Sequence, residues 1–384
     1  MIEQDFKLGI LGGGQLGKML IQAASKWDIK TYVLDPDNEC SSRSICNYFE
    51  KGSFKDYQTV YDFGKKVDLI TFEIEHVNTD ALKQLEKEGK KIYPQPNALD
   101  IIKDKGLQKE FYKKHNIPTS NFKLFSSKKE IITAIEEKII QLPFVQKSRT
   151  DGYDGKGVQT VKKMDDFQLI FDTPSLIEEL VPIEKELAIV VSRNENGNVK
   201  AFPIVEMEFS EDANLVEQLI CPSNVSKTIA SEASDIAEKI ITHLEMVGNL
   251  AVEFFLNKNG EILVNEVAPR PHNSGHHTIE GTITSQFEQH LRAIFNLPLG
   301  STKLISPSVM INILGHPLHN GIASYTNIDA CLDLEGVNIH IYGKKITKPY
   351  RKMGHVTITG NSIEQAKSKA NFIKKQLTVI SNEK

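Results

Sequence analysis

The segment LAVEFFLNKNGEILVNEV, residues 250–267, carries more structural information than any other part of the sequence. Two apolar runs flank NKNG at 257–260, a pattern typical of a β-hairpin with a short turn. If Glu253 lies opposite Val264 in this hairpin, side-chain alternation places Glu253 and Glu266 on the same face of the sheet. The two carboxylates are then diagonal neighbours, with roughly 7–8 Å between their backbones. The opposite face is predicted to be the core face and carries Leu250, Val252, Phe254, Leu256, Leu263 and Val267.

Paired carboxylates on a half-buried sheet predict a metal site. Two such groups repel each other and lose hydration, which costs roughly several kcal/mol unless a cation compensates. Oxygen ligands favour a hard divalent ion, so we expect Mg²⁺, or Mn²⁺ in its place, between the carboxylates and nucleotide phosphates. Asn265 and the polar groups of 270–273 strengthen this interpretation. The alternative is that both carboxylates point into solvent.

The first hundred residues alternate short apolar runs with helical patterns, beginning with a predicted strand at Lys7–Leu11, which is typical of parallel strand-helix-strand units. Within them, GGGQLG at 12–17 matches GxGxxG between a predicted strand and a helix, and Asp35 follows about twenty residues later. Taken alone, this motif predicts an NAD-dependent oxidoreductase. Physically, the glycines establish only a tight turn with helix N–H groups that can meet an anion. The alternative interpretation is a tight strand-to-helix turn that binds no ligand.

A second glycine-rich loop follows Lys147 at 148–157. Three glycines in six residues, with a further cation at Lys156, predict a backbone lid that closes over phosphates. The loop lacks the GxxxxGK[ST] spacing of a Walker A motif, so an ordinary P-loop is not expected. A flexible surface hairpin is the alternative.

A helical stretch is predicted from about Leu99 to His115. A closing helix is predicted to carry an apolar stripe of Ile363, Ala366, Ala370, Ile373 and Leu377.

Composition excludes several classes of protein. The 384 residues are 40% hydrophobic and 25% charged, with no apolar run near the roughly 20 residues that span a bilayer. A net charge of −4 disfavours non-specific electrostatic binding to nucleic acid or to an anionic membrane surface. The four cysteines form no CxxC pair, and no cysteine lies near His272, His276 and His277, so we expect neither a disulfide framework nor zinc. The first residues show no secretory signal, which predicts a cytoplasmic protein.

The motifs occur in an order that resembles the ATP-grasp superfamily and, within it, the N5-carboxyaminoimidazole ribonucleotide synthases. The similarity also includes FEIE at 72–75, NEVAPR at 265–270, HNSGH at 272–276 and RKMGH at 351–355, so it covers nearly the whole chain. Its implied fold class is mixed α/β and α+β, an ATP-grasp fold with a doubly wound parallel-sheet (pre-ATP-grasp) domain and a small β-rich C-terminal domain. The implied domains are 1–98, 99–300 and 301–384, the second containing a lid subdomain at about 118–178 and a nucleotide and magnesium subdomain at about 179–300.

The resemblance implies an enzyme, a homodimer, that carboxylates 5-aminoimidazole ribonucleotide with bicarbonate and ATP, and it implies neither NAD nor biotin. The implied ATP contacts are Lys105, Lys147, Gly152, Tyr153, Asp154, Gly155, Lys156, Gly157, Val158, Glu178, Glu179, Leu180, Val181, Glu186, Asn265 and Glu266. Glu178 to Val181 would lie at the adenine and Glu186 at the ribose. Glu253 and Glu266 would hold Mg²⁺.

Two further groups of residues follow from the resemblance. The ribonucleotide would contact Gln15, Leu16, Glu73, Tyr153, Asp154, Arg270, His272, Asn273, Lys344 and Arg351, the last two at its 5′-phosphate. The implied catalytic residues are Asp154 as proton acceptor, Arg270 on carboxyphosphate and Lys147 on the transferring phosphoryl group, with Tyr153 and His272 beside the amine.

The chain departs from the family pattern at Asp151 and Tyr350, where glycines are common. Three alternative functions stay open: a formate-dependent glycinamide ribonucleotide transformylase or another ATP-grasp ligase, the oxidoreductase, and a non-catalytic nucleotide-binding regulator. The basic residues 344–352 also have an alternative interpretation as a solvated or nucleic-acid-facing patch, which the negative net charge disfavours.

Overall fold

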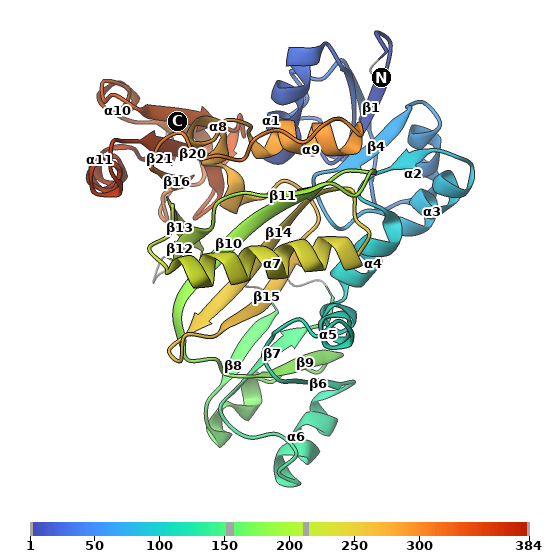
Figure 1. Ribbon diagram of the computed structural model, residues 1–384, viewed down its shortest axis with the longest axis vertical. Coiled ribbons are helices and arrows are strands. Elements are labelled where there is room, and N and C mark those ends of the chain that lie inside the picture. Colours follow the sequence, from blue (N-terminus) through green and yellow to red (C-terminus); the bar gives the residue numbers. More distant parts are fainter. Residues whose placement is uncertain (1–2, 151–156, 210–214, 382–384) are drawn as a thin grey trace.

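The computed structural model describes residues 3–150, 157–209 and 215–381. Its N-terminal part, blue in Figure 1, contains a five-stranded parallel sheet with the order β3-β2-β1-β4-β5. The elements are β1 (Lys7–Leu11), α1 (Gln15–Ala24), η1 (Ser25–Trp27), β2 (Lys30–Asp35), β3 (Tyr48–Lys51), α2 (Tyr57–Gly64), β4 (Leu69–Phe72), α3 (Thr79–Lys87) and β5 (Lys91–Ile92). Separate apolar clusters cover the two faces of the sheet. The predicted doubly wound sheet is confirmed, and its order reverses at β1, where ligands usually bind.

Two helices lead out of this sheet toward the middle of the chain. The helical stretch predicted from Leu99 to His115 is in fact α4 (Pro96–Lys103) and α5 (Lys105–Lys114). Asp104 interrupts it with extended backbone, and its carboxylate accepts hydrogen bonds from the N–H groups of Gly106 and Leu107. These hydrogen bonds satisfy N–H groups that the first turn of a helix cannot satisfy itself, and they fix the start of α5.

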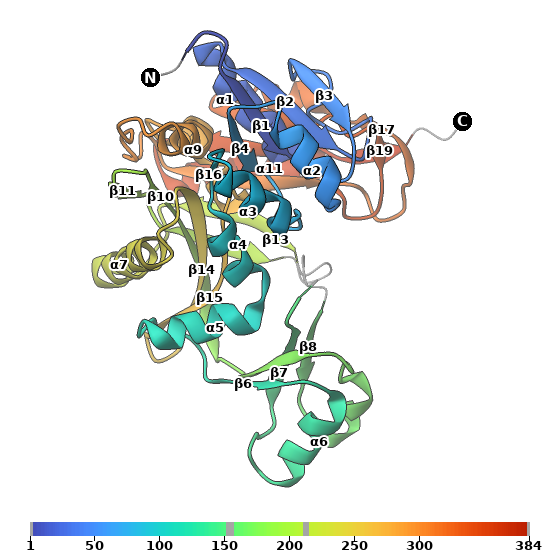
Figure 2. The same ribbon diagram turned by 90° about the vertical axis from the view of Figure 1, so that its right-hand side faces the viewer.

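A small subdomain of its own projects from the body of the molecule (Figure 2). Its sheet has the order β6-β9-β7-β8. The elements are β6 (Phe122–Phe125), α6 (Lys128–Glu136), β7 (Phe144–Ser148), β8 (Val158–Val161), η2 (Met164–Leu169) and β9 (Ser175–Glu179). It has a separate small core around Ile131, Phe144 and Ile177. We call this unit the lid subdomain.

The largest sheet is antiparallel and has the order β15-β14-β10-β12-β13-β16-β20-β18, with β11 beside β10. The strands and flanking helices are β10 (Ile183–Arg193), β11 (Val199–Ala201), β12 (Val205–Phe209), β13 (Val216–Cys221), α7 (Lys227–His243), β14 (Gly248–Asn257), β15 (Ile262–Ala268), η3 (Asn273–Gly275), α8 (Thr278–Gly281), α9 (Gln286–Ile294), β16 (Ser308–Leu314), β18 (Val337–Ile341) and β20 (Lys352–Thr359). Helix α7 packs on β10 and β14 and closes the main core. The C-terminal strands thus extend the same sheet.

The remaining C-terminal elements form a second layer. They are β17 (Gly321–Tyr325), α10 (Ile328–Leu332), β19 (Ile346–Thr347), α11 (Ile363–Gln376) and β21 (Val379–Ser381), and the three strands pair in the order β19-β17-β21. Helix α11 buries Ala366, Ala370 and Ile373 of its predicted apolar stripe. The predicted β-rich C-terminal part is confirmed. Within the described ranges, no helix is long and apolar enough to cross a bilayer.

The hairpin register differs from the predicted one. Phe254 lies opposite Val264, yet the next pair is Glu253 with Glu266, so Asn265 is an additional residue in a β-bulge. The bulge places the two glutamates directly opposite each other instead of diagonally. The prediction that Leu263 belongs to the core is wrong; Ile262 and Val264 are buried there. The prediction that the two glutamates share a face is confirmed.

Candidate functional site

The glutamate pair lies on the polar face of β14 and β15. The side chain of Glu253 is 17% exposed and its Oε1 lies 3.8 Å from His272 Nε2, while Glu266 forms an ion pair with Lys105. Burial and the neighbouring carboxylates of Glu266 and Glu186 raise the pKa of Glu253. The Lys105 ammonium instead lowers the pKa of Glu266. The negative charge of Glu253 is therefore less well compensated than that of Glu266. A hard cation bound by oxygen ligands would supply the compensating positive charge.

Lys147 joins the pair from the lid subdomain. Its Nζ lies 2.8 Å from Asn265 Oδ1 and 2.6 Å from Glu178 Oε2. The bulge thus aims the Asn265 amide at this ammonium. Burial raises the pKa of Glu178, but the ammonium groups of Lys147 and Lys109 outweigh it and lower that pKa to about 2. Glu178 stays ionised between two cations.

The residues expected near the nucleotide base lie at the end of β9 and directly after it. Glu178 is buried, Glu179 and Leu180 are exposed, and Val181 is half-buried. Burial raises the pKa of Glu186, on β10, to about 7, although Lys147 opposes this shift. A half-buried carboxylate on β10 next to the glutamate pair is compatible with a polar ligand group.

The first glycine loop holds an anion that belongs to the protein itself. Glu73, just after β4, accepts hydrogen bonds from the N–H groups of Gly14 at 2.7 Å and of Leu16 and Gly17 at 3.1 Å. A Cβ on Gly14 would lie 2.6 Å from Glu73 Oε1, which explains the glycine. Asp35 Oδ2 likewise accepts from Gly13 N–H at 2.7 Å. Internal carboxylates thus account for the dinucleotide-like spacing.

Arg270 and its neighbours face the N-terminal domain. Arg270 Nη2 lies 2.7 Å from Glu75 Oε1, and the Asn273 amide bonds to Asn312 at 2.9 Å. Burial, with the nearby cations Arg270 and Lys352, lowers the pKa of His272 to about 3. Its imidazole is therefore neutral, and Nδ1 lies 2.9 Å from Ser274 Oγ.

The segment that carries the C-terminal cations lies beside helix α1. Lys344 Nζ donates to the Lys352 carbonyl at 2.8 Å, and Arg351 Nη1 donates to the Ile346 carbonyl at 2.6 Å. Lys18, on the helix that begins with the half-buried Gln15, donates to the Ile341 carbonyl at 3.0 Å. The segment that carries Lys344 therefore lies beside the glycine-loop helix.

Comparisons with known proteins agree with this architecture. Family models match as a ribonucleotide synthetase preATP-grasp domain at 6–103, an ATP-grasp domain at 110–287 and a phosphoribosylaminoimidazole carboxylase C-terminal domain at 308–369. The N5-carboxyaminoimidazole ribonucleotide synthase of Bacillus subtilis is 36% identical over 355 residues, 91% of this chain and 90% of that protein. The chain belongs to the N5-carboxyaminoimidazole ribonucleotide synthase family.

Solved structures of this family superpose closely. The Thermotoga maritima N5-carboxyaminoimidazole ribonucleotide synthetase has a TM-score of 0.90 at 42% identity, covering 98% of this chain and all of that one. The Aspergillus clavatus N5-carboxyaminoimidazole synthase, solved with ADP and 5-aminoimidazole ribonucleotide, has a TM-score of 0.88 at 33% identity, covering 97% of this chain and 98% of that one. The predicted ATP-grasp fold is confirmed.

One relative is longer than this chain and is matched over only part of its length. The chloroplastic phosphoribosylaminoimidazole carboxylase of Vigna aconitifolia is 38% identical over 370 residues, 94% of this chain but 65% of that protein. The chain thus spans about two-thirds of the length of that family member.

Part of the predicted site lies outside the described residues. These positions are Gly152, Tyr153, Asp154, Gly155, Lys156 and the departure Asp151. The loop resumes at Gly157, whose carbonyl accepts from Ser148 N–H at 2.8 Å, and Val158 follows opposite Lys147. Tyr350 adopts φ 59°, a left-handed conformation that favours the glycine common in this family.

Sequence reasoning missed Lys109. Its ammonium is buried and contacts Glu178, Thr119 and Ser120. A usable signal was present, because Lys109 lies four residues after Lys105 and therefore on the same helix face.

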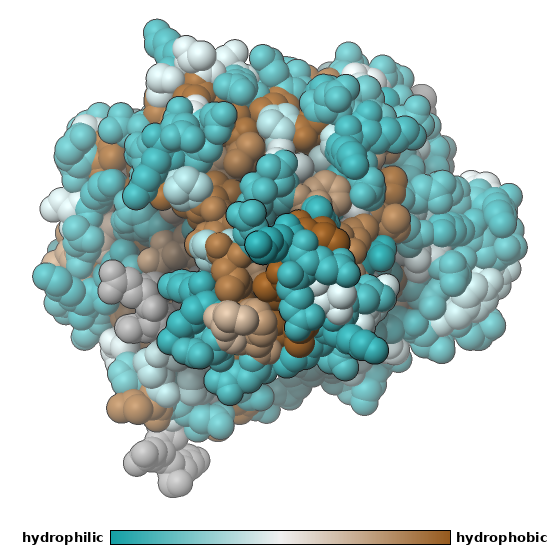
Figure 3. All heavy atoms as spheres, turned by 90° about the horizontal axis from the view of Figure 1, so that it is seen from below, coloured by the Kyte–Doolittle hydropathy of each residue, from teal (hydrophilic) through white to brown (hydrophobic). Residues whose placement is uncertain are grey.

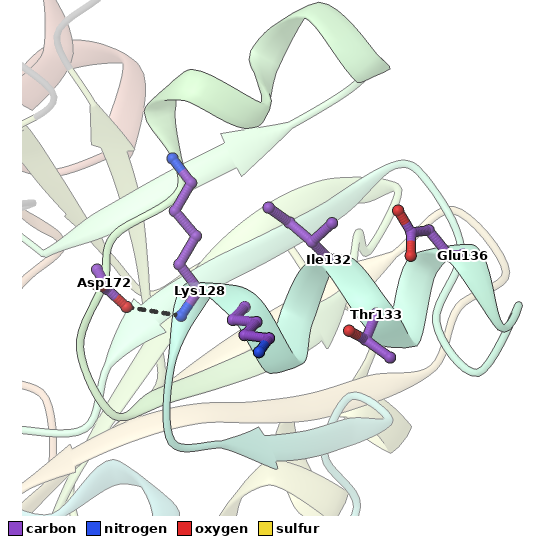
Figure 4. A pocket seen from close by; sticks show the side chains of 6 residues that line it. Lys128, Ile132, Thr133, Glu136 and Asp172 are labelled. Carbon is purple, nitrogen blue, oxygen red and sulfur yellow. Dashed lines mark hydrogen bonds between the residues drawn. The ribbon is translucent and has the colours of Figure 1, made fainter.

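A surface hollow lies on the lid subdomain, away from the predicted site residues. Figure 4 shows it along α6, lined by Lys128, Lys129, Ile132, Thr133, Glu136 and Asp172, none of which is a predicted site residue. Seen from the lid end, apolar residues gather near the middle of the face within a polar rim (Figure 3). The exposed apolar side chains of the lid subdomain include Met164 and Leu169. The hollow along α6 belongs to the outer surface of the lid subdomain.

Proposed function

We propose that this protein carboxylates 5-aminoimidazole ribonucleotide with bicarbonate and ATP, giving N5-carboxyaminoimidazole ribonucleotide, ADP and phosphate. The observation that carries the proposal is the convergence of Glu253, Glu266 and Asn265 with Lys105 and Lys147 in a chain of this family. The Aspergillus clavatus relative, solved with ADP and the ribonucleotide, supports the choice of ligands.

The nucleotide would lie between the lid subdomain and the large sheet. Lys105, Lys147 and the loop at 152–158 would bind its phosphates, Glu178 to Val181 its adenine and Glu186 its ribose. Glu253 and Glu266 would hold Mg²⁺ or Mn²⁺, and the oxygen donors fit such an ion. When bound, it would supply positive charge to the phosphoryl oxygens. Lys147 would add to that charge from the lid subdomain.

The reaction would take place in two stages. A bicarbonate oxygen would attack the γ-phosphorus and release ADP, which gives carboxyphosphate, and Arg270 would orient its oxygens. The exocyclic amine would then attack the carbon of carboxyphosphate with loss of phosphate, or the carbon of CO₂ after phosphate has left, and Asp154 would accept the amine proton. Tyr153 and the neutral His272 would flank the amine.

The ribonucleotide would extend from this point toward the C-terminal segment. Gln15, Leu16, Glu73 and Asn273 would line its path, and Lys344 with Arg351 would bind its 5′-phosphate. The placement of α1 beside the segment that carries Lys344 supports this path. We also propose a cytoplasmic homodimer and the domain division 1–98, 99–300 and 301–384.

The test is coupled ADP release with the ribonucleotide present or withheld, and with bicarbonate or formate. We expect release that depends on both the ribonucleotide and bicarbonate. Glu266→Gln should abolish it while the fold is retained, and Glu217→Gln, an exposed glutamate paired with Lys374, serves as the matched control. Formate-dependent release, or near-normal turnover of Glu266→Gln, would refute the proposal.

A further inference from the structure

The two lysines proposed for the phosphates belong to parts of the molecule that pack separately. Lys105 begins α5, whose Tyr112 is buried in the main core. Lys147 lies in β7 of the lid subdomain, whose core around Phe144 is a distinct cluster. Apolar packing within either core therefore does not fix the distance between the two ammonium groups.

An ion pair joins these parts next to both lysines. Arg149 donates from Nε to Asp104 Oδ1 at 2.9 Å and from Nη2 to Asp104 Oδ2 at 2.6 Å. Lys105 N–H donates to the Arg149 carbonyl at 2.9 Å. A Cβ on Gly106 would lie 2.7 Å from Arg149 Nε, so this glycine makes room for the guanidinium.

The pair is partly shielded from water and geometrically restrictive. The Arg149 side chain is 30% exposed and that of Asp104 is 21% exposed. Two parallel N–H···O bonds fix the relative orientation of the partners in a way that a single ammonium does not. A second tie, between Lys109 and Glu178, lies deeper and contacts Lys147 through Glu178.

We infer that Asp104 and Arg149 are positioning residues that set the relative placement of Lys105 and Lys147 for the nucleotide phosphates. Asp104 precedes Lys105 directly, and Arg149 follows Lys147 by two residues. The inference rests on the proposed phosphate roles of the lysines. Neither Asp104 nor Arg149 would touch the ribonucleotide.

The experiment measures the KM for MgATP, the KM for the ribonucleotide, kcat and the melting temperature. Arg149→Met and Asp104→Asn should each raise the KM for MgATP about tenfold, because misplaced groups lose binding energy, and leave the KM for the ribonucleotide within about twofold. Asn still caps α5, so this variant removes the charge and keeps the helix start. Arg149→Lys should recover only part of the effect.

The matched control is Arg292→Met, which removes an arginine of equal exposure from its pair with Glu288 on α9. It should leave both KM values unchanged. The double variant of Asp104 and Arg149 should resemble either single variant, because both remove the same contact. A normal KM for MgATP in Arg149→Met, or equal changes in both KM values, would overturn the inference.

Variants of the lysines separate this inference from the proposed function. Lys105→Met and Lys147→Met should each weaken MgATP binding more than Arg149→Met does. If they weaken it while Arg149→Met does not, the positioning role alone fails. If neither lysine variant affects MgATP binding, the phosphate assignment fails and the inference fails with it.

Discussion

The carboxylate of Glu73 holds the start of α1, and its removal should destabilise the N-terminal domain. It accepts three backbone N–H groups, from Gly14, Leu16 and Gly17. A hydrogen bond to a charged group contributes about 1.5–3 kcal/mol when taken alone. Burial raises the pKa of Glu73, so for the charged form desolvation outweighs these hydrogen bonds. The cost of removing the side chain therefore comes from the three N–H groups that lose their acceptor, about 1–3 kcal/mol for each group that stays buried. We therefore expect Glu73→Ala to lower the free energy of unfolding by about 2–4 kcal/mol.

The assay is urea unfolding followed by the fluorescence of Trp27, the only tryptophan in the chain. Trp27 ends the short η1 helix that continues α1, so its signal reports on this domain. The measurement is made at pH 8, well above the ordinary pKa of a glutamate. Glu50→Gln removes a partly exposed ion pair with Lys66 in the same domain. It should lower the free energy of unfolding by less than about 1 kcal/mol. Equal unfolding midpoints for Glu73→Ala and Glu50→Gln would refute the reasoning.

Three further predictions address other parts of the molecule. Tyr350→Gly should raise the melting temperature, since it removes about 1 kcal/mol of left-handed strain at φ 59°, whereas Tyr350→Ala should bring no gain. Arg351→Ala should raise the KM for the ribonucleotide about tenfold or more with kcat nearly unchanged, and an unaffected KM in steady-state kinetics contradicts its phosphate role. Lys147 and Lys109 hold the pKa of Glu178 well below its unfolded value, so its stabilising contribution is present above about pH 4 and is lost as the pH falls toward about 2. Glu178→Gln should flatten this acid limb in thermal unfolding scans, and an unchanged slope would count against the ion pairs.

Regular local patterns allowed much of the fold to be predicted. The strand Lys7–Leu11 has the predicted bounds because a continuous apolar run in a parallel sheet stops where its glycine loop begins. The break at Asp104 was missed because 99–115 has helical composition on both sides of it. Only the cap identifies the boundary, and an aspartate inside a charged helical stretch is a weak signal without its hydrogen bonds.

The interior charges were harder to predict than the elements. Lys105 was expected at the site, but the buried partner Lys109 was not, because α5 contains four lysines and lysine is usually exposed. The carboxylate that compensates Lys109 is Glu178, which lies on β9 of another sheet. The spacing from Lys105 places Lys109 on the same helix face, but no pattern within the helix identifies Glu178 as its partner, since that compensation arises from tertiary contact.

The register of the hairpin shows how core packing and site chemistry come to agree. With Val264 buried opposite Phe254, uninterrupted pairing would place Asn265 opposite Glu253 and turn Glu266 to the core face. A carboxylate there would be desolvated without a partner, at a cost of roughly several kcal/mol. The extra residue in the bulge returns Glu266 to the polar face and keeps the apolar residues on both sides of it in the core. Because that residue is Asn265, the correction of register also provides the amide oxygen that holds Lys147.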